Sequence, residues 1–298
     1  MRIVAYDRGG RPGLGVVAQD RLVELALAAP DLPDDLGDLL RLKDGLNAVR
    51  YAVQRCRANH YRPLDGIRYR LPIARPGKIL CLTTNFESTA IQWHRGMPEH
   101  LDLFMRAPTS LTPHDGAMMR PRVSEELDYE AELAVIIGRH ARRVDEVRAL
   151  DHVAGYACFN DGTVRDFQAR TQQWTIGKNF DATGGFGPCM VTADALPPGA
   201  AGLRLESRLC GEPLQSASTG DMIFSVARAI AVLSECMTLE PGDVIAMGTP
   251  GGVGCTRNPR IWMRPGDTVE VSIEGIGVLR NQILCEREAT EVGTRHAA

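Results

Sequence analysis

The run from Tyr129 to Ile137 constrains the fold of this chain more than any other segment, because it places two carboxylates on one side of an apolar strand. In an extended chain, alternate side chains point to the same face. Glu130 and Glu132 therefore share a face with the other even-numbered positions, and the odd-numbered positions form a wholly apolar face. Two like charges on a buried strand are costly unless a proton, a basic partner or a bound cation compensates them. The run predicts a buried strand beside a site for a hard divalent ion.

The composition is that of an ordinary globular protein, with 44% hydrophobic and 24% charged residues among 298. A net charge of −3 provides no basic field for nucleic acid. The N-terminal sequence meets charge too soon for a signal peptide, and no later apolar run is long enough to span a bilayer. The eight cysteines contain no Cys-x-x-Cys pair, which favours reduced thiols over a zinc site. We therefore expect a soluble, cytoplasmic protein that binds neither nucleic acid nor membrane.

The order of strand-like and helix-like segments predicts an α+β fold rather than a doubly wound parallel sheet, because strands and helices do not alternate regularly. We expect a small N-terminal α+β module over residues 1–74, with a helix around 46–57, then a main domain over 75–285 and a disordered tail over 286–298. The clearest helix is expected over 219–237, with Thr219 as its N-cap. Strands of the main domain are predicted over 129–137, 153–159, 203–210, 243–248 and 268–274.

Several short motifs follow one another in an order that carries the strongest functional signal. They are Glu130 with Glu132, Asn160-Asp161, the segment 163–168, Trp174, the segment 177–181 and the glycine-rich loop 248–254. Together they resemble the fumarylacetoacetate hydrolase superfamily, and the N-terminal module is similar to the one that many bacterial members carry. The resemblance extends from about Lys78 to Gln282. It implies a β-rich fold around a rolled mixed sheet, a divalent metal and a homodimer.

The resemblance assigns the metal to Glu130, Glu132 and Asp161. Three carboxylates completed by water suit Mg²⁺, which keeps part of its hydration shell and prefers octahedral oxygen sites. Mn²⁺ and Ca²⁺ accept the same ligands and remain open. Without the two glutamates, Asp161 would be interpreted as a turn residue after Asn160. The glutamates favour the interpretation of Asp161 as a metal ligand.

Catalytic roles are implied for a lysine and for an Arg-Asp-x-Gln segment. Lys178 matches the lysine that stabilises an enolate or delivers a proton in the family, whereas the alternative for it is a surface lysine. Arg165 and Gln168 are expected to orient the metal shell or to contact substrate. An ion pair between Arg165 and Asp166 with a purely structural role is an equal alternative.

Substrate contacts are implied for the glycine-rich loop and for one arginine. Thr249 matches a loop threonine that holds the substrate carboxylate, and Gly248 allows the backbone to approach the ligand closely. A turn would explain the glycines nearly as well. Arg106 is a candidate for the lining of the pocket. The expected ligand is a small 2-oxo or diketo acid.

One departure from the family pattern bears on the reaction. Hydrolytic members typically carry an Asn-Tyr-x-x-His motif followed by an acid, and this pair activates the attacking water. Here Thr89 stands in the position of the histidine and Gln92 in that of the acid. Neither side chain can replace this pair at neutral pH. His94 is the nearby candidate for the missing base, although a histidine beside a tryptophan is also typical of a packed or surface residue.

The chemistry implied by the resemblance is chelation of a 2-oxo acid by the metal, which stabilises an enolate. We expect first a hydrolase that cleaves a carbon–carbon bond in a diketo acid or acylpyruvate, because hydrolases make up most of what the resemblance suggests. An isomerase (tautomerase) or a decarboxylase is the alternative, since these reactions need only the metal-chelated carbonyl, which accepts electron density, and a proton donor such as Lys178. A third class, a member that binds metal and ligand without turnover, is disfavoured by the costly charges that this chain retains.

Overall fold

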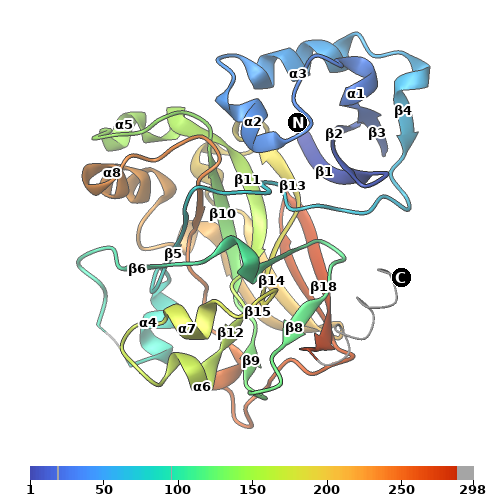
Figure 1. Cartoon of the computed structure of the whole chain (residues 1–298). Helices are drawn as coiled ribbons and strands as arrows, with labels where there is room; N and C mark the ends of the chain where they lie inside the picture. The colour runs from blue at the N-terminus through green and yellow to red at the C-terminus, as the bar shows by residue number, and fades with distance from the viewer. Residues whose placement is uncertain (19, 95, 287–298) are drawn as a thin grey trace.

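The computed structural model describes residues 1–18, 20–94 and 96–286, and strands dominate it (Figure 1). A large mixed sheet has the strand order β4-β3-β2-β1-β13-β11-β10-β16-β5-β6, and β7 pairs with β13 beside this path. Its strands are β1 (Arg2–Arg8), β2 (Arg11–Ala18), β3 (Arg21–Glu24), β4 (Tyr61–Pro63), β5 (Ile79–Leu82), β6 (Leu103–Met105), β7 (Leu111–Pro113), β10 (Ala131–Ile137), β11 (Val153–Asn160), β13 (Gly184–Thr192) and β16 (Val244–Ala246). The predicted α+β, strand-rich fold is confirmed.

A second sheet packs against one face of the large sheet, with the strand order β15-β14-β17-β18-β8. Its strands are β8 (Met118–Arg120), β14 (Arg204–Leu209), β15 (Glu212–Ser218), β17 (Thr268–Ile273) and β18 (Gly277–Cys285). Alternate residues of β17 are buried, namely Val269, Val271 and Ile273, as the sequence pattern predicts for a strand with one face in the core. A short ribbon is formed by β9 (Leu127–Asp128) and β12 (Thr163–Val164).

Strand β10 lies between β11 and β16, and every one of its residues is buried. Its odd-numbered side chains share a core with the second sheet, and Ala134 and Ile136 on the even-numbered face share another core with the N-terminal helices. Coverage of both faces explains why the strand is an almost continuous apolar run. The expected strand is confirmed. Its place in the middle of the large sheet fixes the positions of Glu130 and Glu132 at its N-terminal end.

The strand begins two residues later than the sequence predicts. Tyr129 and Glu130 precede β10, because the side chain of Asn160 takes the place of a ladder partner. Its Oδ1 accepts the N–H of Glu130 at 3.0 Å, and the N–H of Asp161 donates to the carbonyl of Glu130 at 2.9 Å. The backbones that carry Glu130 and Asp161 are thus tied together directly.

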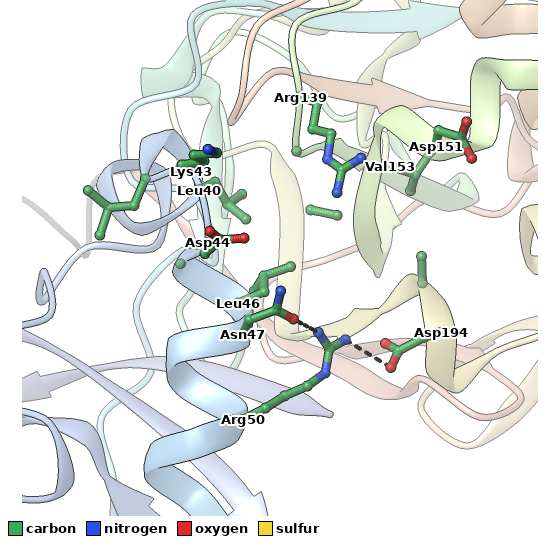
Figure 2. Close-up of a pocket in the computed structure, with 15 residues that line it drawn as sticks. Leu40, Lys43, Asp44, Leu46, Asn47, Arg50, Arg139, Asp151, Val153 and Asp194 are labelled. Carbon is green, nitrogen blue, oxygen red and sulfur yellow. Dashed lines mark hydrogen bonds and ion pairs between the residues drawn. The ribbon is translucent and has the colours of Figure 1, made fainter.

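The N-terminal module extends the large sheet, because β1 pairs antiparallel with β13. Its helices are α1 (Leu25–Ala28), α2 (Leu36–Arg41) and α3 (Gly45–Gln54), and α3 confirms the helix expected around 46–57. Beside α3 lies a cavity of about 230 Å³ (Figure 2). Arg50 forms an ion pair there with Asp194 (Nη2 to Oδ2, 2.8 Å) and donates to Asn47. None of the predicted site residues lines this cavity, and the domain boundary expected after residue 74 stays a prediction.

The helix expected over 219–237 is shorter than predicted, and Thr219 as its N-cap is wrong. Residues Thr219–Asp221 form a single 3₁₀ turn, and α8 runs from Val226 to Cys236 with Ser225 as its cap. The hydroxyl of Thr219 donates to a carbonyl and accepts the N–H of Leu203, so it belongs to the core instead. Residues 223–224 bond to the backbone and side chain of Asn85 and so remain outside the helix.

The remaining short helices surround one end of the large sheet or cover its flank (Figure 1). They are α4 (Glu87–Gln92), α5 (Glu146–Ala149), α6 (Arg165–Gln168) and α7 (Thr175–Lys178). Helices α4, α6 and α7 lie close together in Figure 1, on the side away from the N-terminal module. Within the described residues, no helix has the length and apolar character that crossing a bilayer requires. The disordered tail expected from residue 286 lies, apart from Glu286, outside the described residues.

Candidate active site and metal centre

Three buried carboxylates converge where β10 begins and β11 ends. Glu130 directly precedes β10, Glu132 is the second residue of β10, and Asp161 directly follows β11, which pairs with β10 in antiparallel register. One carboxylate oxygen from each lies within 4.8 Å of the others. The two glutamates therefore share a face, as the alternation predicts, and the third oxygen ligand comes from the neighbouring strand. Oxygen donors at this spacing suit a hard divalent ion.

A lysine and two arginines surround these carboxylates. Lys178, at the end of α7, is fully buried, and its Nζ lies 2.7 Å from Glu130 Oε2 and 2.5 Å from Asp161 Oδ2. Burial lowers the pKa of Lys178, but the carboxylates of Asp161 and Glu130 outweigh burial, so that the pKa is raised above its ordinary value. Lys178 is therefore a buried ammonium group held against the carboxylate cluster.

Glu132 is the member of the cluster that has no cationic partner among the described residues. Its Oε2 accepts the backbone N–H of Gly248 at 2.9 Å, and none of the ion pairs in the described chain includes it. Burial first, and then the charges of Asp161 and Glu130, raise the pKa of Glu132 well above its usual range. A buried carboxylate in this state is stabilised by a divalent ion, so the residues present fit the metal that the sequence implies.

Arg165 holds Glu130 from the side of α6. Its Nη2 lies 2.6 Å from Glu130 Oε1, its Nε lies 2.8 Å from Asp128, and its Nη1 donates to Gln168 Oε1 at 2.9 Å. The carboxylate of Asp166, the alternative partner considered from the sequence, instead accepts the hydroxyl of Ser124, and its one ion pair in the described chain is with Arg170. Arg165 and Gln168 thus lie together beside the cluster.

Arg106 was expected in the lining of the pocket, but it lies behind Asp161. The guanidinium is completely buried and contacts Asp161 Oδ1 at 2.5 Å. It also donates to the carbonyl of Gly162 and to the hydroxyls of Ser110 and Thr183. These bonds hold the carboxylate of Asp161, and with Lys178 they lower its pKa although burial acts in the opposite direction.

Asp128 is an organising residue that the sequence analysis did not single out. It is fully buried, and its carboxylate accepts the N–H groups of Gly254 and Cys255 as well as the Nε of Arg165. It therefore ties the end of the glycine-rich loop to the arginine that contacts Glu130. Its place two residues before Glu130 can be seen in the sequence, but Arg165, Gly254 and Cys255 lie more than 30 residues away in the chain.

The glycine-rich loop is fastened to α4 by three hydrogen bonds, which we call the α4 clasp. Thr89 Oγ1 donates to the carbonyl of Thr249 at 2.5 Å, the N–H of Gly251 donates to Ser88 Oγ at 3.0 Å, and the N–H of Gly252 donates to Gln92 Oε1 at 2.8 Å. Two of the three side chains are those that replace the histidine and the acid of the hydrolytic motif. In this chain both groups are engaged in binding the loop.

The clasp leads to a first prediction. We expect Thr89→Val to lower the free energy of unfolding by about 1–3 kcal/mol, because valine keeps the branched shape but leaves the buried carbonyl of Thr249 without its donor. Urea unfolding in metal-free buffer measures this difference. Thr89→Ser retains the hydroxyl and serves as the control. A Thr89→Val protein that is as stable as the unaltered protein would contradict the clasp.

The hydroxyl of Thr249 is occupied by protein partners. It donates to the carbonyl of Ala131 at 2.9 Å and accepts the side-chain N–H of Gln215, a residue of the second sheet, at 2.8 Å. Gly248 is positioned by the N–H bond to Glu132, and a Cβ there would lie 2.9 Å from the Cβ of Asn85. Glycine is therefore required sterically at 248, whose positive φ of 85° also favours it.

Two cavities adjoin the cluster, and they share part of their lining. The inner cavity, about 10 Å³, has room for a single water at most and is bounded by Thr89, Glu130, Lys178 and Thr249 among others. The outer cavity, about 470 Å³, is open to solvent. Among the described residues, no histidine lines either cavity. His94 is exposed and is not among the residues that line either cavity.

Comparison with known proteins decides the family. The family model of the fumarylacetoacetate (FAA) hydrolase C-terminal domain matches residues 78–284. The chain belongs to the fumarylacetoacetate hydrolase family. An oxaloacetate tautomerase of Bacillus subtilis, YisK, is 42% identical over 224 residues, which are 74% of this chain and 74% of that protein. The resemblance inferred from the motifs is confirmed.

Solved structures of this family have the same fold. A fumarylacetoacetate hydrolase from Exiguobacterium antarcticum is 33% identical, with a TM-score of 0.82 over 96% of this chain and all of that one. A maleylpyruvate hydrolase from Sphingobium, solved with manganese(II) and pyruvate, is 28% identical, with a TM-score of 0.79 over 96% of this chain and 99% of the other. Relatives in this family thus bear the names of both tautomerases and hydrolases, and this chain is an enzyme of that family.

Proposed function

We propose that this protein is a divalent-metal-dependent tautomerase that interconverts the enol and keto forms of a 2-oxo acid. The observation that carries the proposal is the lining of the inner cavity. Its charged side chains are Glu130, Arg165 and Lys178, and the residues in the positions of the hydrolytic base hold the glycine-rich loop. Tautomerisation needs a group that moves a proton, whereas hydrolysis also needs a base that activates water.

The metal proposed at Glu130, Glu132 and Asp161 is Mg²⁺, and Mn²⁺ or Ca²⁺ has the same ligand preference. When bound, a divalent ion would withdraw electron density from a 2-oxo group and favour loss of a proton from the adjacent carbon. Arg106 positions Asp161, and Arg165 with Gln168 positions Glu130. These three are proposed as positioning residues for the ligand carboxylates rather than as proton donors, since the two guanidinium groups remain charged at all working pH values and the amide of Gln168 does not titrate.

Lys178 is the proposed proton carrier. Its Nζ is the group in the inner cavity whose proton can be transferred and returned, and its raised pKa keeps it charged before substrate binds. The ammonium donates a proton to the third carbon of the enol, and the C=C electron pair forms the new C–H bond. The proton released from the enol hydroxyl then returns to the amine. Protons and charge balance, so that no co-reactant is needed.

The substrate carboxylate is proposed to enter beside the glycine-rich loop. Because the hydroxyl of Thr249 is engaged with Ala131 and Gln215, the sequence-derived role of Thr249 as a direct hydroxyl donor requires those bonds to rearrange. The small inner cavity agrees with this requirement, since a 2-oxo acid is larger than one water. Opening of the α4 clasp would widen the inner cavity without moving β10.

Hydrolysis of a carbon–carbon bond, the reaction expected first from the sequence, is the second candidate. Its support is the likeness to a maleylpyruvate hydrolase of Sphingobium. His94 is exposed, and no histidine is among the described residues that line the inner cavity, so this candidate lacks a histidine to activate water there. Decarboxylation would use the same withdrawal of electron density by the metal as tautomerisation. The two reactions are distinguished by their products, because decarboxylation releases CO₂.

The test is product analysis with Mg²⁺ and after chelation with EDTA. We expect Mg²⁺ to accelerate the conversion of enol-oxaloacetate to its keto form, which is monitored by the loss of enol absorbance. We also expect no cleavage of acylpyruvates into two acids. Release of two acids by mass spectrometry would replace the proposal with hydrolysis, and CO₂ formation faster than tautomerisation would replace it with decarboxylation. The homodimer implied by the resemblance stays a prediction that light scattering tests.

A further inference from the structure

All three tryptophans of the chain line the outer cavity. Trp93 follows α4, Trp174 precedes α7, and Trp262 lies in the segment before β17. The chain brings them together from positions that are far apart in sequence. Large aromatic side chains that remain partly exposed around one cavity mark a site that accepts an apolar ligand surface.

The outer cavity is continuous in its lining with the inner one. Trp93, Trp174 and Arg165 line both, so a molecule whose head lies beside Lys178 can extend between the two tryptophans. The guanidinium of Arg165 stacks on Trp93 at 5.6 Å, and Trp174 contacts the ring of Phe104 at 5.9 Å. Both tryptophans are thus held by contacts with residues of the site.

The charges in the outer cavity do not favour a second anionic group on the ligand. Arg165 is neutralised by its carboxylate partners. The other charged side chains in the lining are Glu126, Asp166 and Arg260, and Asp166 is itself paired with Arg170, which leaves one carboxylate and one guanidinium. An anionic tail would therefore gain no net electrostatic attraction over a neutral tail.

We propose that the outer cavity is a tail subsite for a planar, uncharged substituent, aryl or conjugated, on the third carbon of the 2-oxo acid. The inference rests on the proposed function and adds a substrate class to it. A volume of about 470 Å³ falls in the range of ligand pockets and far exceeds the needs of a four-carbon acid. Trp262 forms one wall of the subsite and stacks with the tail. Among the lining residues it is the one farthest in the chain from the metal ligands.

The test compares two unreactive 2-oxo acid analogues, oxamate and N-phenyloxamate, which share the chelating head and differ only in the aryl group. Isothermal titration calorimetry in Mg²⁺ measures their dissociation constants. We expect N-phenyloxamate to bind at least tenfold more tightly than oxamate. Trp262→Ala should reduce that ratio about tenfold, and Trp262→Phe should preserve most of it, because a ring remains for stacking.

Each outcome decides the proposal. Equal affinities of the two analogues for the unaltered protein, or no measurable binding of either, overturn the tail subsite without reference to any variant. A ratio that Trp262→Ala leaves unchanged also overturns it. Turnover separates the two hypotheses: an aryl-dependent gain in affinity without tautomerisation of oxaloacetate or phenylpyruvate would contradict the reaction alone. Metal-dependent tautomerisation of oxaloacetate without any aryl-dependent gain would contradict the subsite alone.

Discussion

Glu132→Gln is expected to reduce the affinity for Mg²⁺ or Mn²⁺ by at least about a hundredfold and, at the same time, to stabilise the metal-free protein. Glutamine keeps an oxygen that accepts the N–H of Gly248, but it removes a ligand charge. It also removes a buried carboxylate whose pKa is raised by burial and by its two acidic neighbours. Relief of that charge should raise the free energy of unfolding in EDTA by about 1–3 kcal/mol.

Titration calorimetry with Mn²⁺ measures the first effect, and thermal unfolding in EDTA measures the second. Glu99→Gln, the same change at an exposed glutamate, is the matched control and should alter neither quantity. The opposite signs make the test specific, since a general loss of structure would lower both metal affinity and stability. A Glu132→Gln protein that unfolds more easily in EDTA, or that keeps its metal affinity, would contradict the proposed metal site.

Lys178→Met is expected to abolish tautomerisation, with a loss of about 10²–10⁴ in rate, and to destabilise the metal-free protein by about 3–5 kcal/mol. Methionine cannot carry the proton, and its thioether leaves the buried carboxylates of Glu130 and Asp161 without their shared cation. Added Mg²⁺ should recover more stability in this variant than in the unaltered protein, because the ion would replace the missing positive charge.

Lys178→Arg separates the two roles of the lysine. Arginine keeps the charge beside Glu130 and Asp161, so we expect most of the stability to remain, but its guanidinium does not release a proton at neutral pH. Enol-oxaloacetate decay and thermal midpoints, each measured with Mg²⁺ and with EDTA, provide the readouts. Full activity in Lys178→Arg would rule out proton transfer by this residue and leave it an electrostatic role.

Local patterns in the chain were sufficient for the carboxylate pair and for the strand that carries it. Alternation alone puts Glu130 and Glu132 on one face, because the side-chain period of a strand is two wherever the strand lies. The motifs that follow in order were sufficient for the family, and with it for the third carboxylate and for Lys178. The α+β fold class followed in the same way from the order of the elements.

Helix boundaries and the partners of polar side chains depended on contacts between distant segments. Thr219 has the chemistry of an N-cap, yet its hydroxyl is bonded to residues 200 and 203, and α8 starts later at Ser225. Arg106 looked like a residue of the pocket but lies buried behind Asp161. A side chain takes the nearest competent partner in space, and sequence distance says nothing about which partner that is.

The meaning of the altered motif also depended on the folded chain. The sequence reveals that Thr89 and Gln92 stand where a histidine and an acid are expected, and chemistry alone excludes them as a water-activating pair. Their bonds to the glycine-rich loop, some 160 residues away, depend on the tertiary structure, because the pairing of β5 with β16 brings α4 against that loop. Residue types limit the reactions that a site can perform, whereas the pairing of distant strands selects the neighbours that each group serves.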